Sequence, residues 1–158
     1  MEHEGGCTCG HLRYVLNAGP FAVHCCHCTT CQIESGSAFA LNGLIETDNL
    51  RITAGSPVIV ETPSESGKGQ NVARCPHCHV AVWSHYMGMG EKAAFVRIGT
   101  LDEPKTFPPQ VHIFVRSKQA WVNLPGDASE FEVFYSRADM DRLFGADGAA
   151  RYRALRGI

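Results

Sequence analysis

The sequence has 158 residues, of which 44% are hydrophobic and 19% are charged, and its formal net charge at pH 7 is -2. A chain of this length can form one domain whose core buries roughly 70% of the unfolded surface. The near balance of charges excludes the large basic surface typical of general nucleic-acid or anionic-membrane binders. We therefore expect one domain with neither a nucleic-acid nor a membrane partner.

The amino-terminal residues Met1 to Gly6 lack the basic and apolar regions of a signal peptide. No apolar run approaches the ~20 residues that a bilayer span needs, and we expect a cytoplasmic protein. Cysteines stay reduced in the cytosol, so the eight cysteines of this chain are better interpreted as metal ligands or catalytic thiols than as disulfides.

Short runs of alternating or continuous apolar residues recur along the chain and predict an antiparallel β protein. Glycine and proline separate these runs and favour turns, and the stretch Ser64 to Gln70 is expected to be a mobile loop. The predicted strands are Leu12 to Leu16, Phe21 to Cys28, Ala38 to Ile45, Val58 to Thr62, Val80 to Tyr86, Ala93 to Ile98 and Val111 to Arg116.

Helical signals come late in the chain. Ser136, followed three residues later by Asp139, resembles a capping box, and the apolar face that follows ends at Gly145. A second short helix is expected from Gly148 to Arg156. We interpret both as helices that pack on the sheet, and the Phe and Trp residues toward the C-terminus as core.

The cysteines fall into three groups whose spacing is typical of metal ligands. A structural zinc site takes four tetrahedral ligands, whereas a catalytic one commonly takes three protein ligands and keeps one exchangeable position. Eight cysteines can supply both kinds of site. The groups are Cys7-Thr8-Cys9, Cys25-Cys26-His27-Cys28-Thr29-Thr30-Cys31 and Cys75-Pro76-His77-Cys78.

The first and last groups together predict a closed site. A tight turn lets Cys75 and Cys78 reach one metal, with zinc–sulfur distances of about 2.3 Å. On an extended strand Cys7 and Cys9 point to the same side and can complete the set. Zinc would then tie the N-terminus to mid-chain, and such binding stabilises zinc-finger peptides by ~10–16 kcal/mol.

The middle group predicts a second site with an open position. If the chain is extended up to Cys28, Cys26 and Cys28 share one face, and Cys31 returns to that face through a turn. The fourth place would be open to water or to a substrate thiol. His24 lies on the same face and is the alternative fourth ligand, in which case the site would be closed and structural.

Other polar residues receive no catalytic assignment. Cys25 is best interpreted as a small buried hydrophobic residue. The candidates for proton transfer, which hydrogen-bonded or surface roles explain at least as well, are His24, Glu34, His85 and His112. The candidates for pairing with substrate carboxylates, which solvated surface charge explains equally well, are Arg51, Lys68, Lys92 and Arg97.

The cysteine groups and their surroundings resemble the glutathione-dependent formaldehyde-activating enzyme family, which includes centromere protein V. Order and spacing agree over about residues 5–125. The matching segments are Gly6-Cys7-Thr8-Cys9-Gly10 before Arg13-Tyr14, Cys26 to Gln32 with Ser35-Gly36-Ser37, Cys75 to Cys78, Gly99 to Asp102, and His112 to Val115 before Trp121.

The resemblance implies a zinc-stapled β-tent, or Mss4-like, fold. We expect one mainly β domain over residues 1–158, with several short antiparallel sheets and a C-terminal helical extension over about 136–156. By position, the resemblance implies two zinc ions per chain. The structural ion would be held by Cys7, Cys9, Cys75 and Cys78, and the catalytic ion by Cys26, Cys28 and Cys31.

The family's reaction is the reversible condensation of formaldehyde with glutathione to S-(hydroxymethyl)glutathione. The resemblance therefore implies a zinc-dependent carbon–sulfur lyase whose partners are a low-molecular-weight thiol and a small aldehyde. Three residues depart from the family pattern and leave the thiol open: His79 replaces a usual glycine, Arg74 replaces a common phenylalanine, and Cys25 is an additional thiol.

The alternative function is that of a non-catalytic, zinc-stabilised module that binds a protein or nucleic acid. A fold by itself does not decide between the two. The three-cysteine second site favours chemistry, and this chain lacks the basic tail that would favour nucleic acid.

Overall fold

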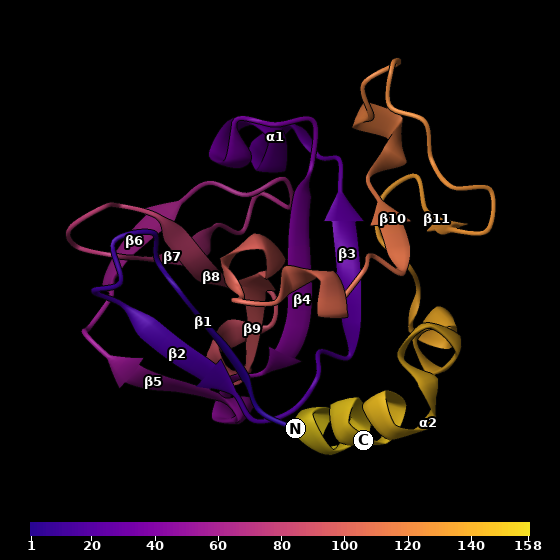
Figure 1. The fold of residues 1–158 in the computed structure, drawn as a ribbon. Coiled ribbons are helices and arrows are strands. Elements are labelled where there is room, and N and C mark those ends of the chain that lie inside the picture. The colour runs from indigo at the N-terminus through magenta and orange to yellow at the C-terminus, as the bar shows by residue number, and fades with distance from the viewer.

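The computed structural model describes all 158 residues, and β-strands dominate it (Figure 1). The strands are β1 (His3–Gly6), β2 (Arg13–Leu16), β3 (Ala22–Cys26), β4 (Ala40–Glu46), β5 (Leu50–Ala54), β6 (Val58–Thr62), β7 (Gln70–Arg74), β8 (Ala81–Tyr86), β9 (Ala93–Arg97), β10 (Val111–Ile113) and β11 (Ser129–Glu130). The helices are α1 (Thr29–Ser35) and α2 (Arg137–Arg156). The predicted mainly β, single-domain fold is confirmed.

The strands form two sheets. The smaller sheet has the order β1-β2-β5, and the larger has the order β11-β10-β3-β4-β9-β8-β7-β6. Most neighbours are antiparallel, as predicted, but β10 runs parallel to both β3 and β11. The antiparallel expectation is therefore wrong at this edge, because the chain returns to β3 through a long connection instead of a hairpin.

The predicted strand at residues 58–62 is confirmed as β6, and most of the others are confirmed with shifted or shorter ends. Strands β1, β5, β7 and β11 were not predicted. The predicted strand from Phe21 stops at Cys26, and helix α1 follows where a turn was expected. The last predicted strand stops at Ile113, because Phe114 adopts the left-handed conformation (φ 56°), which β-strands exclude.

Strand β3 separates two hydrophobic cores. Ala22 and Cys26 belong to one core, whereas Val23, which points to the opposite face, belongs to the other. Opposite Val23, strand β4 carries Gly43, where an added β-carbon would lie 2.7 Å from Ile98 Cδ1. Gly43 therefore lets Ile98 pack directly on β4, and a larger residue here would force the Ile98 side chain to move.

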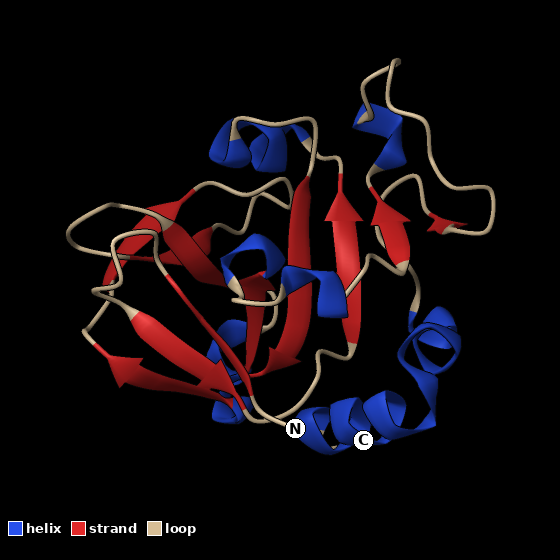
Figure 2. Ribbon diagram, in the orientation of Figure 1, coloured by secondary structure: helices blue, strands red, loops and turns tan.

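Helix α2 covers one end of the larger sheet. The Ser136 backbone N–H donates to Asp139 Oδ2 at 3.0 Å, which confirms the predicted start. Gly145 (φ 67°, ψ 174°) breaks the helix into two segments, as predicted, and Figure 2 shows that they run in different directions. Phe144 stacks on Phe21 with ring centroids 5.7 Å apart. No helix combines the length and apolarity of a membrane span.

Two aromatic residues do not follow the prediction. Phe134 is 40% exposed and belongs to neither core cluster, and Trp121 is more exposed still. Trp121 lies in the long connection between β10 and β11 and is 72% exposed, so its assignment to the core is wrong. Neither core cluster includes it, whereas Tyr135 and Tyr152 farther along the chain are buried.

The pair Glu46 and Arg151 holds α2 on strand β4. Arg151 donates from Nε to Glu46 Oε1 at 2.8 Å and from Nη2 to Oε2 at 2.5 Å. Burial alone would raise the pKa of Glu46, but the hydrogen bonds from Arg151 outweigh it and lower the pKa. The carboxylate is therefore more stable in the folded protein than in the unfolded chain.

We predict that Glu46→Gln lowers the free energy of unfolding at pH 7 by about 1.5 kcal/mol, because it removes one charge from this partly exposed pair. Because the pKa of Glu46 is lower in the folded protein, the ion pair stabilises the protein fully at pH values above the unfolded pKa of about 4.3. This stabilisation is lost as the pH falls through the pKa of the folded state. Urea unfolding at pH 7 and pH 3.5 should thus give a smaller difference in acid. A difference that grows in acid would contradict this assignment.

Candidate metal centres

The first cysteine cluster brings together two segments that are far apart in sequence. The Sγ atoms of Cys7, Cys9, Cys75 and Cys78 all lie within 4.8 Å of one another. Cys9 Sγ lies 3.5 Å from Cys7 Sγ and 3.7 Å from Cys75 Sγ. Four sulfurs around one zinc, at about 2.3 Å from it, would be about 3.8 Å apart in tetrahedral geometry. The donor set and its spacing fit a zinc ion.

Backbone N–H groups are directed at the sulfurs of this cluster. Leu12 N donates to Cys7 Sγ at 3.3 Å, and His77 N donates to Cys75 Sγ at 3.4 Å. Backbone hydrogen bonds, of which the one from Val80 has the largest effect, lower the pKa of Cys78 to about 6. These bonds favour thiolates, the form in which cysteine binds metal.

The local geometry at Cys7 and Cys9 differs from the one predicted. Strand β1 ends at Gly6, and the chain then turns, with Gly10 N donating to Cys7 O at 3.1 Å. The two sulfurs therefore converge through a tight turn and not through alternation along a strand. The expectation of an extended segment is wrong, although the four predicted cysteines do come together.

The second cluster consists of Cys26, Cys28 and Cys31, whose Sγ atoms also lie within 4.8 Å of one another. Cys26 is the last residue of β3, and Cys28 caps α1, accepting a hydrogen bond from Cys31 N at 3.3 Å. Figure 1 shows α1 at the edge of the larger sheet where β3 ends and β4 begins. The trio is assembled by a strand end and the first helical turn, not by the longer strand predicted.

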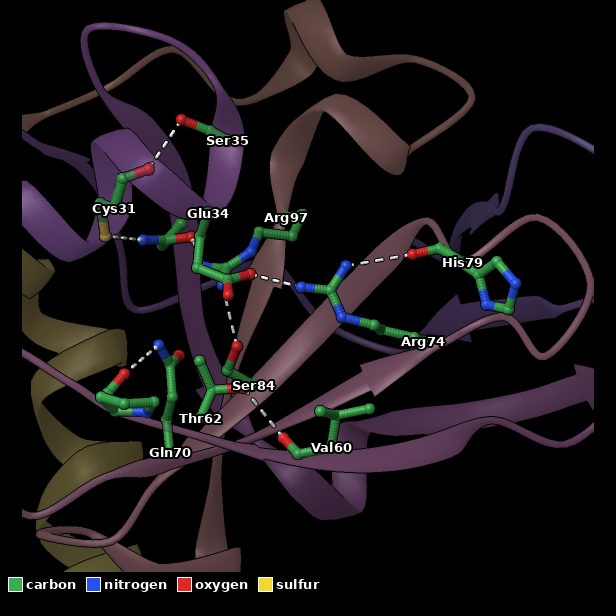
Figure 3. A network of polar contacts seen from close by, with 12 residues as sticks. Cys31, Glu34, Ser35, Val60, Thr62, Gln70, Arg74, His79, Ser84 and Arg97 are labelled. Atoms are coloured by element: carbon green, nitrogen blue, oxygen red, sulfur yellow. Dashed lines mark hydrogen bonds and ion pairs between the residues drawn. The ribbon is translucent and has the colours of Figure 1, made fainter.

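The surroundings of the trio favour a thiolate at Cys31. The neighbouring Cys26 and Cys28 side chains lower the pKa of Cys31 to about 3 against the opposing effect of burial, and the positive charge of Arg97 contributes. Asn42 Nδ2 lies 3.9 Å from Cys31 Sγ, and Arg97 donates to Asn42 Oδ1. Arg97 Nη2 also donates to Ser84 Oγ at 3.0 Å, and Figure 3 shows this network beside Cys31.

The predicted alternative fourth ligand of the second cluster is not part of it. His24 is fully buried, and its Nε2 lies 2.7 Å from the Tyr135 hydroxyl. Burial lowers the pKa of His24 to about 3, so its ring is neutral at physiological pH. The cluster therefore has three sulfur donors and no fourth His, Cys, Asp or Glu donor at ligand spacing.

A cavity of about 420 Å³ lies next to the second cluster, and Cys26 and Cys28 form part of its wall. Its other walls are mainly apolar and include Tyr86, Phe95 and Phe114. A metal held by three sulfurs at this place would have one side facing a cavity of ligand size.

A third group, Cys25, His27 and His112, also has donor atoms within 4.8 Å of one another. His27 Nε2 lies 3.0 Å from His112 Nδ1, and the ring centroids are 5.3 Å apart. The distance between the ring centroids equals the nitrogen–nitrogen distance plus the two distances from centroid to nitrogen. The two nitrogens therefore lie on the line between the centroids and point directly at each other. A metal bound by both rings would instead need the two nitrogen lone pairs to point at a common site beside that line. We therefore interpret the contact as a hydrogen bond and Cys25 as a buried thiol.

An ion pair connects the two cysteine clusters. Arg74, next to Cys75, binds Glu34 of α1 at 2.5 Å and donates from Nη1 to His79 O at 3.1 Å (Figure 3). His79 adopts a left-handed conformation (φ 61°), which is the backbone geometry that glycine favours. The two departures from the family pattern, at 74 and 79, thus contact each other.

The remaining predicted candidates are dispersed. His85 bonds to Ala93 O at 3.1 Å, and Arg51 pairs with Glu2 at 3.6 Å. Of the four basic candidates for carboxylate binding, Lys68 alone lines the cavity. The apolar cavity walls could not be predicted, because their residues come from separated segments that no local pattern connects.

The family model for glutathione-dependent formaldehyde-activating enzyme matches residues 2–117 of this chain. Among solved structures, the chain is similar to a Rhodobacter sphaeroides protein that was a structural genomics target. The sequence identity is 15% and the TM-score is 0.48, over 81% of this chain and 98% of that chain. Such a likeness carries no information on function. No curated protein matches the sequence.

We predict two zinc ions per chain that differ in lability. Four thiolates close the coordination of the first ion, whereas three leave the second ion open to a competing chelator. Metal analysis during titration with a chelator should therefore show one ion lost well before the other. One ion per chain, or two that always leave together, would contradict the presence of two kinds of site.

We also predict different effects for equivalent cysteine substitutions. Cys75→Ser should strongly reduce thermal stability and soluble yield, because it removes a ligand from the cluster that joins distant segments. Cys31→Ser changes an equally buried thiol in the local cluster, and it should stay folded with about one metal ion less. Melting curves with metal analysis test this, and equal loss of folding in both variants would indicate two structural sites.

Proposed function

Because the chain belongs to the glutathione-dependent formaldehyde-activating enzyme family, we propose that it catalyses the reversible addition of a low-molecular-weight thiol to a small aldehyde. Glutathione and formaldehyde are the reference substrates of the family. In the direction of adduct cleavage the activity is that of a carbon–sulfur lyase. The observation that carries the proposal is the three-sulfur cluster, two of whose members line the adjoining cavity.

The reaction needs a thiolate held close to a carbonyl carbon. The sulfur forms a bond to that carbon, the carbonyl oxygen becomes a hydroxyl, and the proton released by the thiol ends on that oxygen. No oxidation occurs. A zinc ion bound by the trio would supply a positive charge that favours an incoming thiol as thiolate. Holding the two reactants together in the cavity would supply much of the rate.

The residues of the chain have separate roles in this proposal. Asn42 and Arg97 hold Cys31 through the polar network behind it, and Arg97 offsets its negative charge. The rings of Tyr86 and Phe95 pack edge to face at 4.8 Å and keep bulk water from one wall. Burial raises the pKa of Tyr86, so its hydroxyl keeps its proton and can donate to an oxygen in the cavity.

We predict that the zinc-loaded protein accelerates the equilibration of formaldehyde with glutathione above the uncatalysed rate. Exchange NMR with and without protein measures this contribution directly. Cys26→Ser and Cys28→Ser should return the rate to background, because each removes a donor of the trio. Cys25→Ser is the matched control: it changes the neighbouring buried thiol, which lies outside the trio, and should retain most of the acceleration.

Two outcomes would overturn the proposal. An absence of acceleration by fully metallated protein, across several thiols and aldehydes, would favour the non-catalytic binding module. Acceleration that survives loss of the trio would show that the reaction occurs elsewhere on the protein.

A further inference from the structure

Part of the cavity wall comes from a segment outside the family match. The matched residues end at 117, whereas Val133 and Phe134 line the cavity from the stretch between β11 and α2. Both side chains are 40% exposed. Exposed apolar side chains that gather at the mouth of a cavity, next to a candidate reaction centre, are typical of a ligand-contacting surface.

This wall is held in place by specific contacts. The Tyr135 hydroxyl bonds to His24 Nε2 at 2.7 Å, and the Phe134 and Tyr135 rings stack at 4.2 Å. Phe114 N donates to Val133 O at 2.7 Å. The exposure of Phe134 is therefore not that of a loose segment, because its backbone neighbours are fixed on both sides.

The charges around the cavity are few. Arg116 pairs with Glu65 at 3.3 Å, which leaves Lys68 as the one lining cation without a carboxylate partner. The other polar side chains at the wall, among them Thr30, Asn42 and Tyr86, are uncharged, and burial keeps the His24 ring neutral. Glutathione is ionised at several positions and, outside its thiol, offers no large apolar group. The cavity thus fits one anionic group and an apolar body better than it fits glutathione alone.

Resting on the proposed function, we propose that the preferred adduct of this enzyme carries a hydrocarbon chain or ring that lies against Val133, Phe134 and Phe95, with a carboxylate near Lys68. The apolar group comes either from the aldehyde or from the thiol. In both cases the same carbon–sulfur bond forms, and the thiol proton moves to the new hydroxyl. The substrate class is thus the apolar hemithioacetal and not the formaldehyde adduct alone.

A binding experiment tests the wall without catalysis. S-hexylglutathione and S-methylglutathione differ only in chain length, and each buried methylene strengthens binding by about fourfold. With partial burial, calorimetry on the zinc-loaded protein should give at least about tenfold tighter binding of the hexyl compound. Phe134→Ala should remove most of this preference. Trp121→Ala removes an exposed aromatic residue that does not line the cavity, and it should leave the preference unchanged.

A substitution at the cation separates charge from the apolar contact. Lys68→Ala should weaken binding of both glutathione derivatives by a similar factor, because both carry the same carboxylates. Equal affinity for the two compounds in the wild-type protein would overturn the inference. So would a hexyl preference that survives Phe134→Ala together with Val133→Ser.

Kinetics identify the source of the apolar group and keep the two proposals distinct. One series varies the aldehyde (formaldehyde, propanal, hexanal) with glutathione, and the other varies the thiol at constant carboxylate (3-mercaptopropanoate, 4-(mercaptomethyl)benzoate) with formaldehyde. The expected result is a kcat/KM that rises with apolar size in one series. Acceleration that is independent of size in both would overturn the inference and leave the proposed function intact. An absence of acceleration in every combination would overturn the proposed function, whatever the binding result.

Discussion

Strand β3 lies between β4 and β10 with both faces covered, and this double burial determines where its side chains point. His24 and Cys26 face the cavity, whereas Val23 and Cys25 face the opposite side. A shift of the strand by one residue would exchange the two sets and remove Cys26 from the sulfur trio. Pairing with strands on both sides thus fixes the register on which the second site, the cavity and the His24–Tyr135 contact all depend.

The membership of the two sulfur clusters could be predicted from spacing, but their local structure could not. Side-chain alternation placed Cys7 with Cys9 and Cys26 with Cys28, whereas the structure uses a tight turn for the first pair and a helix cap for the second. A strand, a turn and a capped helix can all bring sulfurs two residues apart to one point. The spacing therefore constrains which residues meet more strongly than it constrains the backbone that brings them together.

For the fold, strands with an apolar run were predictable, including β6, most of which is exposed. Strand β1 contains two glycines and shows no such run, whereas β5 alternates apolar and polar residues and still was not predicted. The parallel pairing of β10 with β3 depends on how a long connection returns, which no local signal records. The cavity escaped prediction for the same reason: its walls combine β3, β9, β10 and the stretch before α2, and the last of these lies outside the family match.

The residues that cover β3, in β10 and in the stretch up to Tyr135, are synthesised long after β3 itself. A ribosome adds about 5–20 residues per second, and a domain generally folds as a unit. The Cys26–Cys31 segment is synthesised on the order of 100 residues before Phe134, which corresponds to roughly 5–20 s. During that interval the thiols lack their apolar wall. Metal binding and other reactions of the free thiols can therefore precede closure of that wall, which needs β10 and the stretch up to Tyr135.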